Sequence, residues 1–318
     1  MKILITGAAG FVGQLLAKTL LNDPMGQHTL VLTDIVEPPI PAGVQHPQNA
    51  TCLKADLLTQ SDAVVRKDLD AVFIFHGIMS SGSEADFDLG MRVNFDATRN
   101  LLETLRTVCP GVKVLYTSSQ AVYGGPVPTP VSEAVRATPE SSYGCAKMMC
   151  EYLITEYHRR QFVDALIFRL PTISVRPGKP TAAASSFLSG MIREPMQGIE
   201  CVIPVKNRSY EHRLCSPGTL VGNLVHSLSL HRHVLPEFDR VMTLPGITVT
   251  VQDMMDSLAR VGGENKLKLL REEEDEALKK ILYSWPAEFD SSRALGLGFK
   301  APGSMDDIVR EFKAYLAQ

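Results

Sequence analysis

Residues 143–147 read YGCAK, so Tyr143 and Lys147 stand four positions apart with small residues between them. On a helix, positions i and i+4 share one face, and both side chains could point at one bound molecule. A tyrosine and a lysine in this arrangement could move a proton. The same spacing also arises by chance, as a half-exposed aromatic residue beside a solvated cation, so the rest of the sequence must decide between the two interpretations.

A glycine-rich loop near the N-terminus could bind a dinucleotide. The segment ITGAAGFVG places Gly7, Gly10 and Gly13 directly after a strand-like run and at the start of a helical pattern. Glycines allow the tight turn and let backbone N–H groups approach a pyrophosphate at the positive end of the helix. A glycine cluster that only packs a helix on a strand is the structural alternative.

Asp34 ends the next apolar run, about twenty residues after the glycines, where dinucleotide-binding proteins hold the adenosine ribose. A carboxylate there can accept hydrogen bonds from both ribose hydroxyls and would repel a 2′-phosphate. No arginine or lysine adjoins Asp34. The sequence therefore favours NAD over NADP as the cofactor.

The first half of the chain alternates short apolar runs with longer amphipathic ones. The apolar runs, which are rich in β-branched residues and expected as buried strands, are KILIT (2–6), TLVLTD (29–34), AVFIFH (71–76), VKVLYTS (112–118) and DALIFRL (164–170). The helical patterns between them cover about 11–23, 59–67, 87–109 and 142–161. This order predicts an α/β fold, a doubly wound parallel Rossmann sheet with helices on both faces.

After residue 170 the rhythm changes, because RPGKP, REP, IPVKNR and SPG interrupt short segments. Helical patterns return near 217–231, 251–261, 272–283 and 304–317. We therefore expect two domains, an NAD-binding Rossmann domain over residues 1–170 and a smaller α/β substrate lobe over residues 171–318. The two are expected to interleave, with some C-terminal segments returning to the sheet.

The composition is that of an ordinary globular protein with a small-molecule partner. Hydrophobic residues make up 45% and charged residues 21%, and the net charge of −3 gives no electrostatic footprint for nucleic acid or an anionic membrane. The six cysteines lack a C-x-x-C or paired-histidine spacing, so neither a disulfide framework nor a metal site is expected. No apolar stretch approaches the length of a membrane span, and the strand-like N-terminus leaves no room for a removable signal. A cytoplasmic location is expected.

Further candidates lie where apolar runs end, at the edge of the sheet that binds ligands in such folds. Asp56 and Leu57 lie in the run TCLKADL, where an aspartate could reach the adenine amine. A helix N-cap followed by a core leucine is an equal alternative. His76, Gly77 and Ile78 end the fourth strand, the run that begins at residue 71, and they either contact the cofactor or cap the strand with a hydrogen-bonded histidine.

Several motifs in one order resemble the extended short-chain dehydrogenase/reductases. They are ITGAAGFVG, Asp34, Asp56-Leu57, HGI, Asn94 in RVNFDATRNLL, TSSQAVYG, YGCAK and RLP. The resemblance runs from residue 1 to about 175 and returns with FDSSRALGLGF near the C-terminus. This family includes nucleotide-sugar epimerases and sugar-acid dehydrogenases, so the resemblance implies a Rossmann fold, a nicotinamide cofactor and hydride transfer.

The resemblance assigns catalytic roles to Tyr143 and Lys147. Tyr143 would be the general base that removes a hydroxyl proton, and Lys147 would favour the phenolate of a group that otherwise titrates at about 10. Ser119, in the segment SSQAVYG, would hold the substrate oxygen beside Tyr143. Ser118 is the alternative, although the family spacing favours Ser119.

The resemblance also implies which residues bind NAD. Asn94 matches the position that supports the lysine through the helix backbone, although a surface or capping asparagine is equally compatible with the sequence. Residues 171–173 match a stretch that packs on the nicotinamide carboxamide through its backbone. The full set expected to contact the cofactor is Gly7, Ala9, Gly10, Phe11, Val12, Gly13, Asp34, Ile35, Asp56, Leu57, His76, Gly77, Ile78, Asn94, Thr117, Tyr143, Lys147, Pro171, Thr172 and Ile173.

Substrate recognition requires groups that hold a carboxylate and several hydroxyls. The segments 168–198 and 80–103 resemble a group within the family that oxidises the 2-hydroxyl of a four-carbon sugar acid with NAD. A planar guanidinium offers a carboxylate two donors in register, which makes Arg176 the first candidate, before Arg213 and Lys179. The complete set expected to bind substrate is Ser80, Ser81, Ser119, Gln120, Tyr143, Thr172, Arg176, Lys179 and Arg213.

The sequence leaves several functions open. The main expectation is an NAD-dependent dehydrogenase of a small sugar acid. A nucleotide-sugar epimerase or dehydratase shares the motifs up to residue 170, and a ketoreductase remains an alternative because NRSYEHRLCSP (207–217) departs from the group's pattern. A dinucleotide-binding regulator without chemistry is a further alternative. The helices over 87–109 and 142–161 carry apolar residues on more than one side and match a dimer interface in relatives, so a homodimer is expected.

Overall fold

The computed structural model describes residues 1–179 and 184–317 of the 318-residue chain. The chain divides into two compact units. The first unit comprises Met1–Val122, Ser141–Arg169 and Val221–Met242, and the second comprises Tyr123–Glu140, Leu170–Leu220 and Thr243–Gln318. Each unit is therefore assembled from separate stretches of the chain.

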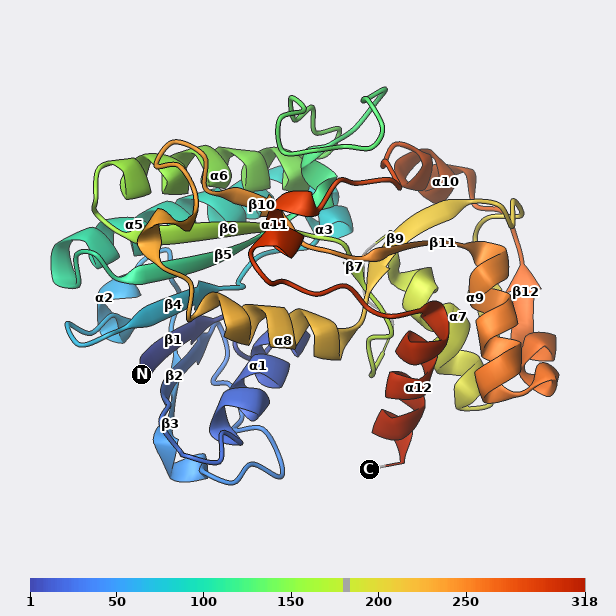
Figure 1. Ribbon diagram of the computed structural model, residues 1–318, viewed down its shortest axis with the longest axis horizontal. Coiled ribbons are helices and arrows are strands. Elements are labelled where there is room, and N and C mark those ends of the chain that lie inside the picture. The colour runs from blue at the N-terminus through green and yellow to red at the C-terminus, as the bar shows by residue number, and fades with distance from the viewer. Residues whose placement is uncertain (180–183, 318) are drawn as a thin grey trace. The chain divides into compact units, whose positions relative to one another are not determined.

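The first unit is built on a seven-stranded sheet (Figure 1). Its strands are β1 (Lys2–Thr6), β2 (Thr29–Asp34), β3 (Ala50–Lys54), β4 (Ala71–Ile74), β5 (Lys113–Ser119), β6 (Asp164–Leu170) and β10 (Val241–Thr243). Their order is β10-β6-β5-β4-β1-β2-β3, and β1 pairs in parallel with both β2 and β4. The strand order reverses beside β1, which is the point at which doubly wound sheets bind ligands. The predicted Rossmann architecture is confirmed.

The central strands of this sheet are apolar on both faces. Ile3, Leu4 and Ile5 of β1 are fully buried, and so is every residue of β4. Such continuous apolar runs suit strands that helices cover on both sides. Figure 1 shows α5 (Ala97–Val108) and α6 (Ser142–Arg159) over one face of the sheet and α1 (Phe11–Leu21) against the other.

Two helical segments of the first unit differ from prediction. The pattern over 59–67 forms a single turn, α2 (Ser61–Val64), and the pattern over 87–109 forms α4 (Phe87–Met91), a π-helical turn η2 (Arg92–Asp96) and α5 in succession. A π turn changes the register of a helix, and Asn94 lies within this one. The remaining segments are η1 (Pro47–Asn49), α3 (Ser80–Ala85), η3 (Gln120–Val122), η4 (Arg232–Val234) and most of α8 (Pro217–Ser227).

The second unit contains a three-stranded and a two-stranded sheet. β9 (Glu211–Cys215) pairs antiparallel with β11 (Ile247–Thr250) and parallel with β7 (Thr172–Ile173), while β8 (Cys201–Ile203) pairs in parallel with β12 (Leu270–Glu272). The helical elements are α7 (Ser186–Met196), α9 (Val251–Ser257), η5 (Leu258–Gly262), η6 (Glu264–Leu269), α10 (Glu276–Tyr283), α11 (Ser292–Gly296) and α12 (Met305–Leu316). An apolar cluster of their side chains forms the core of this unit. Over residues 1–179 and 184–317, no helix combines the length and apolarity needed to cross a membrane.

Helix α7 was not expected from the sequence. The prolines after residue 170 predicted only short irregular segments, but α7 runs for 11 residues and contains Pro195 one residue before its end. Leu188, Met191 and Ile192 of this helix are almost completely buried. Tertiary burial of an apolar face supplies most of the stability of helices in proteins, and here it outweighs the unfavourable proline.

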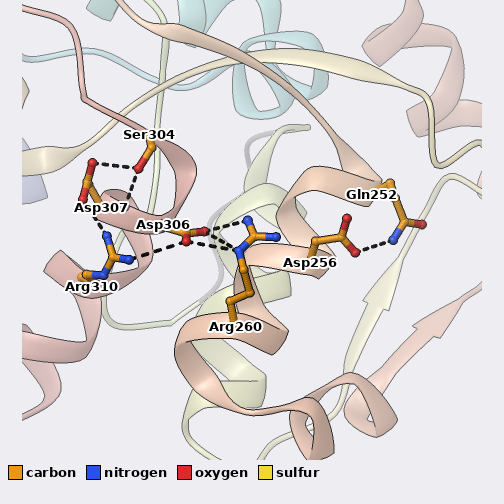
Figure 2. Close-up of polar contacts among 7 residues, drawn as sticks. All are labelled: Gln252, Asp256, Arg260, Ser304, Asp306, Asp307 and Arg310. Carbon is orange, nitrogen blue, oxygen red and sulfur yellow. Dashed lines mark hydrogen bonds and ion pairs between the residues drawn. The ribbon is translucent and has the colours of Figure 1, made fainter.

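Polar contacts connect the C-terminal helix α12 to the π-helical turn η5 within the second unit (Figure 2). Arg260 donates to Oδ1 of Asp306 at 2.8 Å, and Arg310 lies 3.6 Å from the other carboxylate oxygen. The hydrogen bond from Arg260 is the main reason that the pKa of Asp306 falls to about 2. The arginines are largely exposed, so these pairs stabilise little, and the buried Ile308 and Phe312 hold the helix in place.

Candidate active site

The glycine loop leaves no room for side chains. Gly7 has a φ of +66°, and a Cβ added to it would lie 2.6 Å from the backbone nitrogen of His76. A Cβ on Gly13 would lie 2.6 Å from the carbonyl oxygen of Gly7, so the first turn of α1 packs directly on the loop. Such a turn, at the N-terminus of a helix beside the switch point of the sheet, fits the pyrophosphate of a dinucleotide. Phe11 and Val12 are half-buried at the start of α1.

Asp34 lies beside this loop at the carboxyl end of β2. Its Oδ2 accepts a hydrogen bond from the backbone nitrogen of Ala9 at 3.0 Å, and its Oδ1 accepts one from Ile35 at 2.7 Å. The carboxylate is therefore hydrogen bonded directly to the backbone of the glycine loop. This position suits an acceptor for the ribose hydroxyls of NAD.

Leu57 matches its structural alternative, whereas the interpretation of Asp56 as a helix N-cap is wrong. Oδ1 of Asp56 accepts a hydrogen bond from the backbone nitrogen of Leu58 at 2.9 Å, and the carbonyl of Asp56 accepts one from Gln60. The aspartate therefore forms the turn that leads into α2, although it is not the N-cap residue, which is Gln60. Leu57 is 6% exposed and belongs to the core. Contact of either residue with adenine stays a prediction.

His76 is held between two threonines. Its Nδ1 lies 2.9 Å from the hydroxyl of Thr6, and its Nε2 lies 3.2 Å from the hydroxyl of Thr98. Burial, followed by the charge of Lys147, lowers the pKa of His76 to about 3. The imidazole is consequently neutral near pH 7 and caps the end of β4 through hydrogen bonds at both ring nitrogens.

Asn94 is 2% exposed, so the interpretation as a surface asparagine is wrong. Its Oδ1 accepts from the backbone nitrogen of Ile78 at 2.7 Å, and its Nδ2 donates to the carbonyl oxygen of Ile78 at 3.1 Å. Nδ2 also donates to Ser83 at 3.1 Å. A Cβ added to Gly77 would lie 2.7 Å from Oδ1 of Asn94. The asparagine thus fixes the backbone of the HGI segment after β4.

Lys147 is buried close to Tyr143. Its Nζ donates to the carbonyl oxygen of Thr117 at 2.9 Å and lies 4.7 Å from the ring centroid of Tyr116 and 5.6 Å from that of Tyr143. Burial lowers the pKa of Lys147 to about 8, and the charge of Glu151 opposes this shift. The structure therefore brings the ammonium and the half-buried phenol together on one face of α6.

The two serines at the end of β5 have different surroundings. The hydroxyl of Ser118, which is 2% exposed, donates to Oε1 of Glu151 at 2.5 Å. Ser119 is half-buried, and its hydroxyl accepts a hydrogen bond from the backbone nitrogen of Ala121 at 3.1 Å, which leaves the hydroxyl proton available for another acceptor. This arrangement favours Ser119 as the residue that contacts a substrate.

Glu151 forms a buried ion pair that the sequence analysis missed. The side chains of Glu151 and Arg169 are 2% and 4% exposed, and Nη2 of Arg169 lies 2.6 Å from Oε2 of the carboxylate. Glu151 is four residues after Lys147 on α6, and it binds Ser118 on β5 as well. Charged residues within the apolar contexts CEYL and IFRL were the signal available in the sequence. The pair joins α6 to the ends of β5 and β6.

Within the second unit, Thr172 is hydrogen bonded to a buried histidine. Its hydroxyl lies 2.7 Å from Nε2 of His212, and the hydroxyl of Tyr210 lies 3.1 Å from Nδ1 of the same ring. Pro171 and Ile173 on either side of Thr172 are buried, whereas Thr172 is only half-buried. Thr172 therefore retains accessible surface.

The candidate carboxylate-binding residues differ in how their nitrogens are used. Arg213 is 6% exposed and donates from Nη1 to the carbonyl oxygen of Phe289 at 3.1 Å and from Nη2 to Ser291 at 2.6 Å. Both terminal guanidinium nitrogens of Arg213 are thus engaged in hydrogen bonds within the second unit. Arg176 is half-buried, and its backbone is held by Ser189 and Arg193.

The remaining candidates come from both units. Lys179 is exposed. In the first unit, Ser80 is buried at the start of α3, Ser81 is half-buried, and Gln120 is buried in η3. Their common role in substrate binding stays a prediction.

The fold and the first unit's residues define a class of protein. A doubly wound sheet, a tight glycine loop at the switch point, an acidic residue at the end of β2 and a tyrosine beside a buried lysine describe a dinucleotide-dependent α/β enzyme. The family model described as NAD dependent epimerase/dehydratase family matches residues 3–209, and the chain belongs to this family. The predicted resemblance and the NAD cofactor are confirmed.

Individual relatives cover the chain almost completely. D-erythronate dehydrogenase from Haemophilus influenzae is 42% identical over 99% of both chains, and D-erythronate dehydrogenase from Cupriavidus necator is 42% identical over 98% of both. A crystal structure described as a nucleoside-diphosphate-sugar epimerase from Agrobacterium tumefaciens is 36% identical, with a TM-score of 0.92 over 100% of this chain and 95% of the other. L-threonine 3-dehydrogenase from Trypanosoma brucei shares the fold, with a TM-score of 0.85 at 24% identity.

Proposed function

We propose that this protein oxidises the secondary alcohol of a small sugar acid with NAD, and that the substrate is D-erythronate or a close 2-hydroxy acid. The observation that carries the proposal is the 42% identity to two D-erythronate dehydrogenases, which extends over nearly the whole chain. It therefore includes the C-terminal third of the chain beyond residue 209, where the family model ends.

The proposed mechanism assigns one proton transfer to three residues. Tyr143 takes the proton of the substrate hydroxyl, because the ammonium of Lys147 lies 5.6 Å from its ring and favours the phenolate. The hydroxyl of Ser119 donates to the substrate oxygen and holds it in place. NAD, when bound, would supply the hydride acceptor for the same carbon. Lys147 keeps its position because Thr117 accepts one of its hydrogen bonds.

The residues of the first unit are compatible with NAD. The backbone of the loop at Gly7, Gly10 and Gly13 would bind the pyrophosphate, and the carboxylate of Asp34 would bind the adenosine ribose. The absence of a Cβ at Gly77 makes room for Oδ1 of Asn94, which a Cβ there would approach to 2.7 Å. Asn94 would act by holding the HGI backbone in place.

For the substrate carboxylate, we propose Arg176 as the main partner. A planar guanidinium offers a carboxylate two donors in register. Arg213 is the less suitable of the two arginines because both of its terminal nitrogens are hydrogen bonded to Phe289 and Ser291. Lys179, Ser80 and Ser81 remain secondary candidates for the carboxylate and the hydroxyls.

The test is a cofactor-reduction assay with purified protein. D-erythronate, other four- and six-carbon aldonates, uronates and simple 2-hydroxy acids are offered with NAD or NADP, and NADH is followed by its absorbance. We expect turnover with NAD and a small aldonate, and a Tyr143→Phe variant that binds NAD normally but turns over at least about 10²-fold more slowly. Undiminished turnover by Tyr143→Phe would refute the role of the tyrosine.

A nucleotide-sugar epimerase or dehydratase is the second candidate, favoured by the 36% identical structure described as a nucleoside-diphosphate-sugar epimerase. The same assay separates the two, because an epimerase returns the hydride to its product and releases no free NADH. A ketoreductase is separated by running the reaction with NADH and carbonyl compounds. Net reduction of NAD by an aldonate supports the dehydrogenase.

We also propose a homodimer through the helices over 87–109 and 142–161. Tyr152 on α6 is 69% exposed, and Phe87 and Leu89 on α4 are 60% and 43% exposed. Leu101 and Leu105 of α5 are instead fully buried within the first unit, so they serve the core. Analytical ultracentrifugation tests the proposal, since Tyr152→Lys should convert a dimer into a monomer; a monomeric wild-type protein would contradict it.

A further inference from the structure

A chain of hydrogen bonds in the second unit runs from a strand residue to a helix end. The hydroxyl of Thr172 on β7 lies 2.7 Å from Nε2 of His212 on β9. Nδ1 of this ring lies 3.1 Å from the hydroxyl of Tyr210, which donates to the carbonyl oxygen of Leu282 at 3.1 Å. His212 is 2% and Tyr210 is 7% exposed, so water does not compete for these bonds.

The carbonyl at the end of this chain determines where each proton lies. A carbonyl oxygen only accepts, so the single proton of the Tyr210 hydroxyl is used by Leu282. The bond between Tyr210 and His212 then requires that Nδ1 of the ring carries the proton and donates it. Nε2 is consequently the bare nitrogen, and Thr172 must donate to it. Only this arrangement makes all three hydrogen bonds at once.

The environment keeps His212 in the neutral form that this arrangement needs. Burial lowers the pKa of His212 to about 4, and burial raises the pKa of Tyr210 above its ordinary value. The ring of Tyr210 is stacked on Tyr283 with centroids 4.8 Å apart, which fixes the position of its hydroxyl. The tautomer is therefore set by packing and by the carbonyl of Leu282 together.

We propose that His212 and Tyr210 are positioning residues that make the hydroxyl of Thr172 a pure hydrogen-bond acceptor toward a bound ligand. The proton of this hydroxyl is used by His212, and the lone pairs of its oxygen remain for a ligand. A threonine without such a partner could rotate to donate or to accept. This one favours ligands that present an N–H or O–H group and disfavours ligands that present only an acceptor.

The location of Thr172 indicates which donors it meets. It follows the last residue of β6, Leu170, by two positions along the chain, and the carboxyl ends of such strands bind ligands. The inference rests on the proposed function, which supplies two donors of the required chemistry. These are the amide N–H₂ of the nicotinamide carboxamide and a hydroxyl of the sugar acid.

The first experiment compares Thr172→Val, which has nearly the same shape but no hydroxyl, with Thr172→Ser, which keeps it. We expect Thr172→Val to lose about ten- to a hundred-fold in either NAD affinity, measured by calorimetry, or in kcat/KM for the acid at saturating NAD. A loss of NAD affinity identifies the carboxamide as the donor, and a loss confined to kcat/KM identifies the substrate hydroxyl. Thr172→Ser should retain both. Loss of neither in Thr172→Val overturns the inference.

A cofactor analogue tests the direction of the bond. The 3-acetylpyridine analogue of NAD replaces the amide N–H₂ by a methyl group and keeps the carbonyl acceptor. If the carboxamide is the donor, the wild-type protein binds the analogue more weakly than NAD, and Thr172→Val removes most of this discrimination. Equal discrimination by both proteins, together with unchanged kcat/KM, would contradict the proposed acceptor.

The third measurement is independent of any turnover. In ¹⁵N-histidine-labelled protein, the nitrogen shifts should report the Nδ1–H tautomer for His212 from pH 5 to 8. Tyr210→Phe should shift it toward the other tautomer, whereas Tyr283→Phe, which keeps the stacked ring, should leave it unchanged. An Nε2–H tautomer in the wild-type protein overturns the inference even if sugar acids are oxidised, and the Nδ1–H tautomer supports it even if the proposed substrate fails.

Discussion

At the scale of single residues, Ser118 and Ser119 are adjacent yet serve different partners. Ser118 donates into the buried Glu151–Arg169 pair, whereas Ser119 keeps a proton that it can offer to a substrate oxygen. We predict that Ser119→Ala lowers kcat by about 10²-fold with little change in the melting temperature. Ser118→Ala should instead cost about 1 to 3 kcal/mol of unfolding free energy, because a buried carboxylate loses a donor.

Steady-state kinetics and chemical denaturation of the two variants check this prediction. The variants are matched controls for each other, since each deletes one hydroxyl from the same strand end. A larger loss of kcat in Ser118→Ala than in Ser119→Ala would exchange the two roles. If both variants lose the same unfolding free energy, the hydrogen bond from Ser118 to Glu151 adds no stability of its own.

Lys147 makes the reaction sensitive to alkaline pH. Its pKa of about 8 lies well below the ordinary lysine value because of burial, so the unliganded protein loses the ammonium as the pH rises through 8. The neutral amine no longer favours the phenolate of Tyr143, and kcat/KM for oxidation should fall on this limb of the pH profile. Lys147→Arg keeps its charge at all these pH values and should lack the falling limb, even if its overall rate is lower. A wild-type profile that keeps rising to pH 10 would rule this out.

Contacts between residues close in the sequence could be predicted, whereas contacts between distant residues could not. Tyr143 and Lys147 could be paired from the sequence because helical spacing is a local property. The pair Glu151–Arg169 lies on different elements, and only the fold brings the two charges together. The same holds for Arg213, whose partners Phe289 and Ser291 are more than 70 positions away. Its use within the protein could not be predicted from its type.

At the scale of elements, the packing of α1 on the loop at Gly7 gives a direct prediction. A Cβ at Gly13 would lie 2.6 Å from a backbone oxygen, whereas a Cβ at Gly222 in α8 would meet nothing within 4 Å. Gly13→Ala should therefore displace α1 from the loop and weaken NAD binding by at least about tenfold, together with a loss of stability. Gly222→Ala should be neutral or stabilise by up to about 1 kcal/mol, because alanine is the better helix former.

Calorimetric NAD titration and thermal melting of both variants test this expectation. If Gly13→Ala binds NAD as the wild-type protein does, the close approach of helix and loop is not required for the cofactor. Gly222→Ala controls for the general effect of a methyl group on a helical glycine.

The elements of the first unit were easier to predict than those of the second. Strands such as β1 and β2 matched their expected ranges, because continuous apolar runs in a parallel sheet have few alternatives. The π turn at Asn94 and the short α2 could not be read from periodicity, since both depend on contacts with other segments. In the second unit, Pro195 argued against a helix at α7, but tertiary burial stabilises this helix.

At the scale of the whole molecule, buried neutral histidines should make the protein sensitive to acid. Burial lowers the pKa of His158 to about 3 and that of His212 to about 4. Nδ1 of His158 accepts from the backbone nitrogen of Ala165 at 3.0 Å, a bond that protonation would break. As the pH falls below about 6.5, the unfolded state binds protons that the folded state does not, so the unfolding free energy decreases until the folded pKa values are reached.

We predict a loss of up to about 1.4 kcal/mol per pH unit for each of these histidines between pH 6 and 4. Denaturant titrations at several pH values measure it. His158→Gln, whose side-chain oxygen can still accept from Ala165, should show a shallower decline than the wild-type protein. An identical slope would mean that this histidine is protonated equally in both states.

The strand β10 has a consequence for how the protein is made. The backbone nitrogen of Ile167 on β6 donates to the carbonyl oxygen of Arg240, and the guanidinium of Arg240 donates to the carbonyl oxygen of Ala165 at 2.8 Å. The exposed edge of β6 is therefore covered by residues that are synthesised some seventy positions later. A nascent or truncated chain that stops at residue 170 exposes an uncovered hydrogen-bonding edge. The nucleotide-binding half is therefore not a portable module, and grafting it onto another protein would require carrying residues 221–242 with it.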